Sequence, residues 1–253
     1  MIDFELLRAE VARHPYPLLF ATVSGAHLYG FPSADSDYDL RGIHILPAHE
    51  VLGLLPRTET IEMEGMRGNI ELDLVTHDAL KFLNMLLKRN GYVLEQLYSP
   101  LVVHAAPEHA ELKEIARGCV TRYHSHHYLG FAAKQWDLFQ KEDPPRAKPL
   151  LYVYRVLLTG ICLMRTGLVE SNLLTLNELF RLPYIDELVQ HKLQGAETTK
   201  LEFLDRRFHR SEYERLVAEL ETAAAASNLP GEPSCLRELS DLMVRIRLQT
   251  TNN

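Results

Sequence analysis

The amino-acid sequence predicts an α+β protein, in which a small domain with a mixed β-sheet is followed by an all-helical domain. Two observations predict this fold class. Apolar runs that are β-branched or alternate with polar residues lie before residue 105, and helical periodicity dominates the chain beyond it. The 253 residues suffice for one large domain or two small ones. We therefore place the sheet domain at residues 1–105 and the helical domain at 106–253.

The elements of the first domain follow from apolar spacing and from glycine and proline punctuation. In chain order we predict a helix at 2–13, a buried strand at 18–24, a strand at 37–46, a loop or irregular hairpin at 51–69, a strand at 69–76 and an amphipathic helix at 77–89. The pair Asn90-Gly91 is a typical helix stop and is expected to end the last of these elements.

The second domain shows only helical spacing. Helices are predicted at 107–117, 119–141, 147–165, 175–193, 199–225 and 235–249. Two proline-containing segments, DPPRAKP at 143–149 and NLPGEP at 228–233, separate neighbouring helices. The chain carries no internal repeat.

Composition limits the classes of partner. The net charge is −7, so no global basic field attracts nucleic acid or an anionic membrane, and a nucleic-acid partner would need a local basic groove. Cys119, Cys162 and Cys235 are odd in number, far apart and without a CxxC pair, which is typical of reduced, packed thiols. No stretch reaches about 18 uncharged apolar residues, the length expected of a membrane span, and MIDFELLRAE lacks the features of a signal peptide. We expect a cytoplasmic protein without a membrane partner.

A group of carboxylates is the first indication of chemistry. Asp37 and Asp39 lie two residues apart in a predicted strand and therefore point to the same face, whereas Tyr38 points towards the core. Adjacent carboxylates repel unless a cation lies between them, and Mg²⁺ or Mn²⁺ is suited to that position. Asp73, in a later strand, could join them if the strands are neighbours. Three acids suffice for a two-ion site, although an isolated Asp-x-Asp pair is more often a solvent-facing strand edge.

A glycine turn precedes these acids. Ser24 and Gly25 end the buried strand twelve positions before Asp37, where backbone N–H groups could cradle a phosphate. Arg41 lies on the same strand face as Asp39 and could pair with an acid or with a phosphate. The turn and the acids together favour a site for a metal-bound phosphate ester over a solvated hairpin.

These residues resemble the DNA polymerase β nucleotidyltransferase superfamily. The blocks VSGAHLYGFPSADSDYDLRGIHILP at 23–47 and ELDLVTHDALKFLNMLLKRNGYVLEQLYSP at 71–100 are similar, more specifically, to its RNA-ligase-associated, or RNA-repair-pathway, family. The resemblance covers roughly residues 18–165. It implies a polymerase β-like catalytic domain in which Asp37 and Asp39 bind two Mg²⁺ ions and Asp73 holds the catalytic metal and orients or deprotonates the acceptor.

The resemblance also implies a role for a helix in the second domain. Lys148, Tyr152 and Arg155 fall at i, i+4 and i+7, on one helix face, a pattern that by spacing alone is more often a solvated surface. In the family a similar helix follows the catalytic domain, where triphosphate-binding groups are typical. One residue departs from the superfamily pattern: Ala26 stands where Ser usually follows the glycine. We expect this change to weaken or alter triphosphate binding, with Ser24 or His27 as the available substitutes.

Two further clusters allow opposite interpretations. His124 has His127 at i+3 and Tyr128 at i+4, which could indicate a metal site, but without nearby cysteine a polar helix face is the simpler interpretation. Alternatively, a substrate groove could be lined by His127, Tyr128 and Lys134. The stretch RRFHR at 206–210, followed by Tyr213, could bind RNA phosphates and bases, but its acidic neighbours indicate an ordinary charged helix.

The sequence thus predicts an enzyme that transfers NMP from an NTP to an acceptor hydroxyl and releases pyrophosphate. The resemblance implies an RNA end as acceptor, and RNA and an RNA ligase as partners. Alternatives are nucleotidylylation of a protein or a small molecule, a non-catalytic nucleotide-binding module, and a structural adaptor that would leave the acids unexplained. The preferred base, the use of a template and the oligomeric state stay open.

Overall fold

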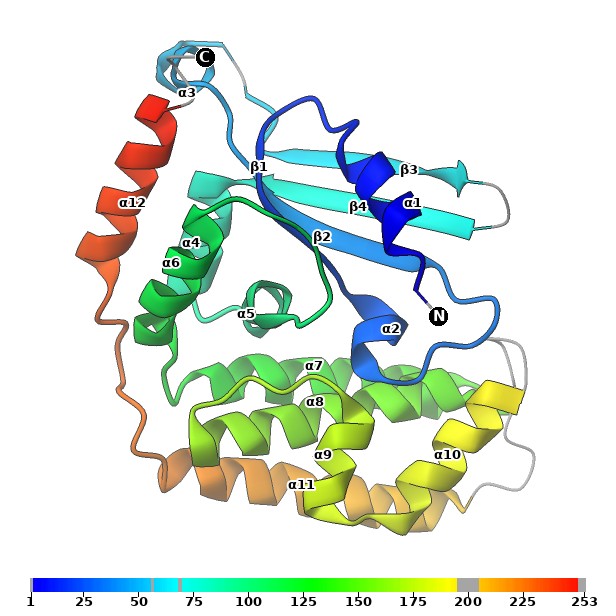
Figure 1. Ribbon diagram of the computed structural model, residues 1–253. Coiled ribbons are helices and arrows are strands. Elements are labelled where there is room, and N and C mark those ends of the chain that lie inside the picture. Colours follow the sequence, from blue (N-terminus) through cyan, green and yellow to red (C-terminus); the bar gives the residue numbers. More distant parts are fainter. Residues whose placement is uncertain (1, 56, 68–69, 195–204, 250–253) are drawn as a thin grey trace. The chain divides into compact units, whose positions relative to one another are not determined.

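The computed structural model describes residues 2–55, 57–67, 70–194 and 205–249 (Figure 1). The chain forms two compact units that interleave in sequence. Unit 1 comprises Met1–Gly25, Asp37–Val120 and Glu232–Asn253, and unit 2 comprises Ala26–Ser36 and Thr121–Gly231. A single domain boundary near residue 105 stays a prediction about domain organisation. Residues 26–36, which precede Asp37, belong to the helical unit 2, and the C-terminal helix belongs to unit 1 with the sheet.

Unit 1 is built on a five-stranded mixed sheet, which confirms the predicted α+β class. The strands are β1 Leu18–Val23, β2 Tyr38–His44, β3 Thr60–Arg67, β4 Ile70–Asp78 and β5 Val102–Ala105, in the spatial order β3-β4-β2-β1-β5. The central pair β2–β4 is parallel and the other three pairs are antiparallel. The two strands that carry the predicted acids are therefore immediate neighbours in the middle of the sheet.

The helices of unit 1 cover both faces of this sheet. They are α1 Phe4–Val11, α3 Ala48–Leu52, α4 Ala79–Leu87, α5 Gly91–Tyr98, α6 Glu108–Ala116, the 3₁₀ turn η1 Arg117–Cys119 and α12 Leu236–Gln249 (Figure 1). On one face, Leu7 of α1 packs in a cluster with Leu40 and Leu74. On the other face, Phe20 of β1 meets Phe82 of α4 edge-on, with 5.6 Å between ring centroids. Side-chain alternation along each strand separates these two layers.

The last helix, α12, is fastened to the sheet by a buried ion pair. Arg247 donates to both carboxylate oxygens of Asp78 at 2.7 and 2.6 Å. Asp78 also accepts hydrogen bonds from the backbone N–H groups of Leu46 and Leu80, so it caps α4 as well. A buried charge pair is tolerated when its oxygens are hydrogen-bonded in this way, and losing one partner would leave an uncompensated charge.

Unit 2 is helical. It contains α7 His124–Lys141, α8 Ala147–Thr166, α9 Leu173–Phe180, α10 Pro183–Gln194 and α11 Arg206–Ala225, and it includes all but the first residue of α2 Gly25–Tyr29. The helix α8 is long and apolar enough to cross a membrane by length and composition, but 89% of its apolar window is buried inside the structure. Such burial is typical of a core helix, around which α7, α9, α10 and α11 pack.

Most predicted elements are present, and four differences have local causes. The strand β3 replaces the predicted loop or irregular hairpin: its apolar pattern is weak because the inward-facing positions of this edge strand are only half-buried and include Gly65 and Arg67. The four-residue β5 is too short to show a pattern. Asn90, predicted as part of a helix stop, also begins the next helix: its side chain accepts hydrogen bonds from the backbone N–H groups of Tyr92 and Val93 and caps α5. The helix predicted at 175–193 is two helices, and the start of the one predicted at 199–225 lies outside the described residues.

Candidate active site

The glycine turn and the Asp-x-Asp strand are in direct contact. The backbone N–H of Ser24 donates to the carbonyl oxygen of Asp39 at 2.7 Å, directly after β1 ends. Gly25 has a left-handed φ of +59°, and a Cβ atom placed there would lie 1.8 Å from Oδ2 of Asp39. Both the backbone conformation and the close carboxylate require glycine at this position. The predicted phosphate end and metal end of the site therefore adjoin.

The register of the central strands brings two of the three predicted acids together. In the parallel β2–β4 pair, Asp39 lies opposite Asp73. Leu40 and Leu74 point to the cluster with α1, so the two carboxylates share the opposite face, as the alternation predicts. Asp37 lies one residue before β2 and is half-buried.

Arg41 holds this pair of carboxylates, and we call Asp39, Asp73 and Arg41 the acid face. Its Nη2 donates to Oδ1 of Asp39 at 2.6 Å and to Oδ2 of Asp73 at 2.7 Å. Its Nη1 donates to the carbonyl oxygens of Leu40 and Asp73 at 2.8 and 2.7 Å, and its Nε to the Tyr92 hydroxyl at 3.0 Å. These are all five N–H donors of a guanidinium, and the side chain is only 12% exposed. In this arrangement Arg41 fixes the spacing of the carboxylates rather than facing a phosphate.

The electrostatics of Arg41 agree with that role. Burial alone would lower the pKa of Arg41, but the tyrosine hydroxyl and the two carboxylates outweigh burial and hold its pKa above the ordinary value. The guanidinium therefore stays charged and offsets one of the negative charges on the acid face. It was predicted as a partner for an acid or a phosphate, and the structure shows the acid contacts.

The acid face offers oxygen atoms of the kind a hard divalent ion binds. Oδ1 of Asp73 is buried and lacks a hydrogen-bond partner among the described residues, although Oδ2 is held by Arg41. Mg²⁺ is commonly held by one or two carboxylates together with water and substrate phosphates. No three His, Cys, Asp or Glu side chains in the described parts of the chain are grouped closely enough to hold a metal by themselves. The donor chemistry thus fits an ion that is completed by phosphate oxygens.

Sequence comparison identifies the family. The family described as the RNA repair pathway DNA polymerase beta family matches residues 2–245. The chain belongs to this family. It is therefore a nucleotidyltransferase-like protein, in agreement with the resemblance carried by its motifs.

Two relatives and one solved structure are similar to this chain. A Methanocaldococcus jannaschii protein described as uncharacterized protein MJ0002 is 34% identical over 156 residues, which cover 61% of this chain and 63%, less than two thirds, of that protein. A Bacillus subtilis protein described as uncharacterized protein YcgL is 27% identical over 223 residues, 84% of each chain. A crystal structure of a nucleotidyltransferase-like protein from Exiguobacterium sibiricum aligns over 88% of this chain and 73% of that one, with a TM-score of 0.34 and 14% identity.

The pair Tyr29-Gly30, which follows the Ser24-Gly25 turn within the block at 23–47, lies in unit 2. The ring of Tyr29 faces Arg155, whose guanidinium carbon is 3.8 Å from the ring centroid. Gly30 has a φ of +88°, and a Cβ atom there would lie 2.5 Å from Oδ1 of Asn172, so the Tyr-Gly pair seats against α8 and the start of α9. No contact of Tyr29 was predicted from the sequence, although its place in a specific motif was the available signal.

The predicted face of α8 exists, and two of its three residues pack around Tyr29. Tyr152 meets Tyr29 and Phe31 edge-on at 5.5 and 5.8 Å between centroids. Arg155 is 2% exposed, and Lys148 is half-buried in the first turn of the helix. We call Tyr29, Tyr152 and Arg155 the aromatic face. Whether it binds a triphosphate stays a prediction.

The loop that follows the Tyr29-Gly30 pair is held inside unit 2. Lys192 of α10 is buried and donates to the carbonyl oxygen of Phe31 at 3.0 Å and to the Ser33 hydroxyl at 3.2 Å. Ala26, the departure from the superfamily pattern, is itself buried in α2. Ser24, one of the expected substitutes, is 1% exposed.

The two ambiguous clusters are engaged in packing. The ring nitrogen Nδ1 of His124 accepts from the backbone N–H of Thr121 at 3.2 Å, at the start of α7. Tyr213 stacks on Trp136 with 4.6 Å between centroids and 5° between planes. Arg206 donates to the carbonyl oxygen of Glu142 at 2.7 Å. These contacts favour the structural interpretation of both clusters.

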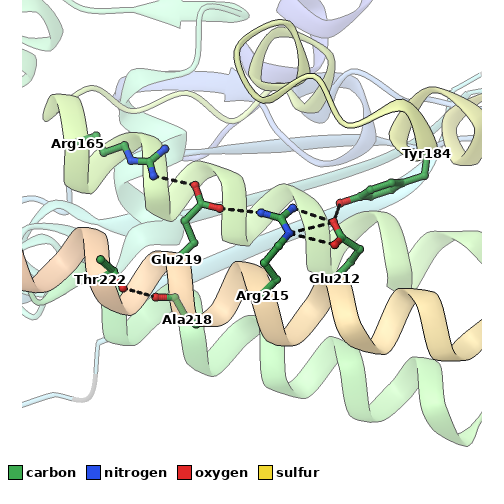
Figure 2. Close-up of polar contacts among 7 residues, drawn as sticks. All are labelled: Arg165, Tyr184, Glu212, Arg215, Ala218, Glu219 and Thr222. Atoms are coloured by element: carbon green, nitrogen blue, oxygen red, sulfur yellow. Dashed lines mark hydrogen bonds and ion pairs between the residues drawn. The ribbon is translucent and has the colours of Figure 1, made fainter.

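A cavity in unit 2 is lined by none of the predicted site residues. It has a volume of about 890 Å³ and lies between the end of α8 and α11. Figure 2 shows the ionic ladder beside it, in which Glu219 bridges Arg165 and Arg215 at 2.8 and 3.0 Å, and Glu212 continues the ladder to Tyr184. The charges in this ladder balance within the protein, which is typical of a stabilising surface network rather than of a charged ligand site.

Proposed function

We propose that the protein is a metal-dependent nucleotidyltransferase that transfers NMP from an NTP to an acceptor hydroxyl and releases pyrophosphate. The observation that carries the proposal is the pairing of Asp39 with Asp73 on parallel strands, against the turn at Gly25. Paired carboxylates attract a divalent cation, and backbone N–H groups at a glycine turn attract a phosphate. Family membership supports the same reaction class.

Mg²⁺, or Mn²⁺, is the proposed cofactor, held in a two-ion site by Asp37, Asp39 and Asp73. When bound, it stabilises the charge that develops on the phosphates. Arg41 keeps the carboxylates of Asp39 and Asp73 at a fixed separation through its bonds to one oxygen of each. Oδ1 of Asp73 is the oxygen that lacks a protein donor among the described residues, so we assign it to orient the acceptor hydroxyl or to accept its proton.

The phosphates of the NTP are assigned to the turn and to the aromatic face. The backbone at Ser24 and Gly25 would cradle one phosphate. Lys148, Tyr152 and Arg155 would bind and neutralise the triphosphate, because a nucleotide with three phosphates needs cations from the protein as well as from the metal.

The proposed acceptor is an RNA end, with an RNA ligase as a functional partner in the cytoplasm. The support is the family's description as part of an RNA repair pathway. This assignment is by analogy, because the acceptor would be selected by surfaces that differ among members of a superfamily. Nucleotidylylation of a protein or a small molecule is the alternative, and a non-catalytic nucleotide-binding module, motivated by Ala26, is the second.

The test measures pyrophosphate release and label transfer from each α-labelled NTP, with Mg²⁺ or Mn²⁺, to an RNA carrying a free 3′-hydroxyl, to the protein itself and to lysate. Asp73→Asn is expected to lower the transfer rate by on the order of 10² to 10³. Glu71→Gln is the matched control, because Glu71 is an exposed acid two residues earlier on the same strand and should leave the rate unchanged.

Each outcome decides between the functions. Label on RNA supports the proposal, and label on polypeptide but never on RNA favours protein modification. NTP binding without pyrophosphate release under either metal supports the non-catalytic module. Full activity in the Asp73→Asn protein would contradict the metal assignment.

A further inference from the structure

Two cysteines that lie far apart in the sequence meet in unit 1. The Sγ atoms of Cys119, in η1, and Cys235, directly before α12, are 3.1 Å apart. Both side chains are buried, Cys119 at 0% and Cys235 at 5% exposure. A disulfide has an S–S bond of about 2.05 Å, so the sulfur atoms are about 1 Å from bonding distance. From the sequence alone, the two residues were expected to be unrelated packed thiols.

The backbone around the thiol pair is arranged for this close approach. The N–H of Ser234 donates to the carbonyl oxygen of Gly118 at 2.9 Å. A Cβ atom at Gly118 would lie 2.7 Å from the Cβ of Cys235, so any larger residue would push the two segments apart. A hydrogen bond and a glycine therefore hold the neighbouring residues of both cysteines together.

The pair also has a particular place along the chain. The chain leaves unit 1 after Val120 and returns to it at Glu232. A bond between Cys119 and Cys235 would close a loop of 116 residues that contains the whole second segment of unit 2. The two ends of this segment are also close together within unit 2, because the N–H of Arg122 donates to the carbonyl oxygen of Pro230 at 3.1 Å.

We propose that Cys119 and Cys235 form a redox modification site, at which a low-molecular-weight disulfide oxidises the thiol pair to an intramolecular disulfide. In the first step, the thiolate of Cys235, the more exposed of the two, attacks the small disulfide, and one small thiol leaves. In the second step, the thiolate of Cys119 attacks Sγ of Cys235 and the second small thiol leaves. Two protein thiols and one small disulfide thus give one protein disulfide and two small thiols.

Burial determines the rate of this exchange and the persistence of the product. It raises the pKa of the Cys119 thiol and of the Cys235 thiol, so little thiolate is present at neutral pH. Exchange therefore needs a local opening at the start of α12 and is slow. The same burial shields the disulfide from reducing thiols once it has formed.

The third cysteine is an internal control. Cys162 lies in α8, is buried, and its Sγ contacts the Thr166 hydroxyl at 3.8 Å. It belongs to unit 2, and among the described residues the apolar side chains around α8 leave it without a second thiol at bonding distance. It should remain a thiol under conditions that oxidise the pair.

The experiment treats the wild-type protein with oxidised glutathione at mildly alkaline pH, quenches it with acid, and counts thiols after denaturation. We expect the count to fall from three to one, and non-reduced peptide mapping to find the Cys119–Cys235 crosslink with a loss of two hydrogen atoms. The oxidised protein should melt roughly 5 to 15 °C above the reduced protein, and a reductant should reverse the shift.

Variants separate the pair from the rest of the chain. Cys162→Ser should retain the crosslink and the shift in melting temperature, whereas Cys235→Ser should lose both. The wild-type thiol count needs no variant and decides the proposal even if a variant folds poorly. Three free thiols after oxidation, glutathione adducts on Cys119 or Cys235 without a crosslink, or a crosslink through Cys162 would each overturn it.

Discussion

Arg41 in unit 1 and Arg155 in unit 2 are both shielded from solvent, but their guanidinium groups meet different surroundings. Arg41 bonds one oxygen each of Asp39 and Asp73. Arg155 lies 3.8 Å above the ring of Tyr29. A carboxylate cancels the formal charge of an arginine, whereas an aromatic ring attracts the cation through its quadrupole and adds no charge.

The difference shows in what each arginine does to its neighbours. Arg41 acts on geometry, because its donors tie two strands and a tyrosine into one fork. The positive charge of Arg155 acts beyond its contacts: burial lowers the pKa of His127, and Arg155 lowers it further. The two faces therefore differ in composition: the acid face combines two carboxylates with one guanidinium, and the aromatic face sets a guanidinium against a ring.

Among the changes that test this comparison, the largest expected effect comes from filling the space at Gly25. Gly25→Ala places a methyl group against the Asp39 carboxylate and forces a left-handed conformation on a residue that disfavours it. We expect the nucleotidyl-transfer rate to fall by at least about 10², because displacements of about 1 Å at a reacting centre have effects of that size. Steady-state kinetics, with circular dichroism to confirm folding, measure this.

A second glycine supplies the matched control. Gly130 lies inside α7, and a Cβ atom there would meet nothing within 4 Å. Gly130→Ala should leave transfer unchanged and stabilise the protein by up to about 1 kcal/mol, the usual gain for this change within a helix. Equal activity of the two variants would show that the contact between the turn and Asp39 is irrelevant to function.

Replacing Arg41 distinguishes positioning from phosphate binding. Arg41→Gln removes a positive charge beside two carboxylates, so Mn²⁺ should bind about tenfold more tightly in a titration followed by electron paramagnetic resonance. Transfer should nevertheless slow by on the order of 10², because Asp39 and Asp73 lose their shared fork. Arg41→Lys keeps the positive charge but not the geometry of the guanidinium. Its Mn²⁺ affinity should therefore equal that of the wild-type protein, whereas its transfer rate should stay as low as that of Arg41→Gln. A raised KM for NTP with unchanged metal affinity would indicate a phosphate ligand instead.

Local patterns in the sequence were sufficient for the centre of this acid face. Alternation in DYDLRGIHIL and in NIELDLVT identified two strands and the faces of Asp39 and Asp73, and the structure makes those strands neighbours. The glycine was recognised from its position after a buried strand. Such signals are local, because strand periodicity and turn residues act within a few residues of the chain.

The partners that complete each face could not be predicted, because they come from distant segments. Tyr92, which accepts from Arg41, lies 51 residues away, at the start of a helix hidden by an Asn-Gly pair that looked like a helix stop. Cys119 and Cys235 are 116 residues apart, with nothing in their local sequence to indicate a meeting. Tertiary packing decides these contacts, and one sequence carries no record of it.

A smaller effect is expected on the aromatic face. Tyr29→Leu removes the ring under Arg155 and should reduce the free energy of unfolding by about 2 to 4 kcal/mol, since a buried aromatic side chain and a cation–π contact are both lost. Tyr29→Phe keeps the ring and should lose less than about 1 kcal/mol. On the proposed function, Tyr29→Leu should also weaken NTP binding severalfold in calorimetry. If NTP affinity were unchanged in both variants, the assignment of Arg155 to the triphosphate site would be wrong.

The smallest effect is expected at the edge of the acid face. Tyr92→Phe removes the one hydrogen bond to Nε of Arg41 and leaves the four to Nη1 and Nη2 in place. The free energy of unfolding should fall by about 1 kcal/mol, and the transfer rate by only a fewfold, because the carboxylates remain bridged. Tyr98→Phe is the matched control, since Tyr98 lies on the same helix and its hydroxyl donates to the carbonyl oxygen of Lys113 at 2.7 Å. It should cost similar stability without altering Mn²⁺ affinity, so a shift in Mn²⁺ affinity confined to Tyr92→Phe would trace the effect to the Arg41 fork.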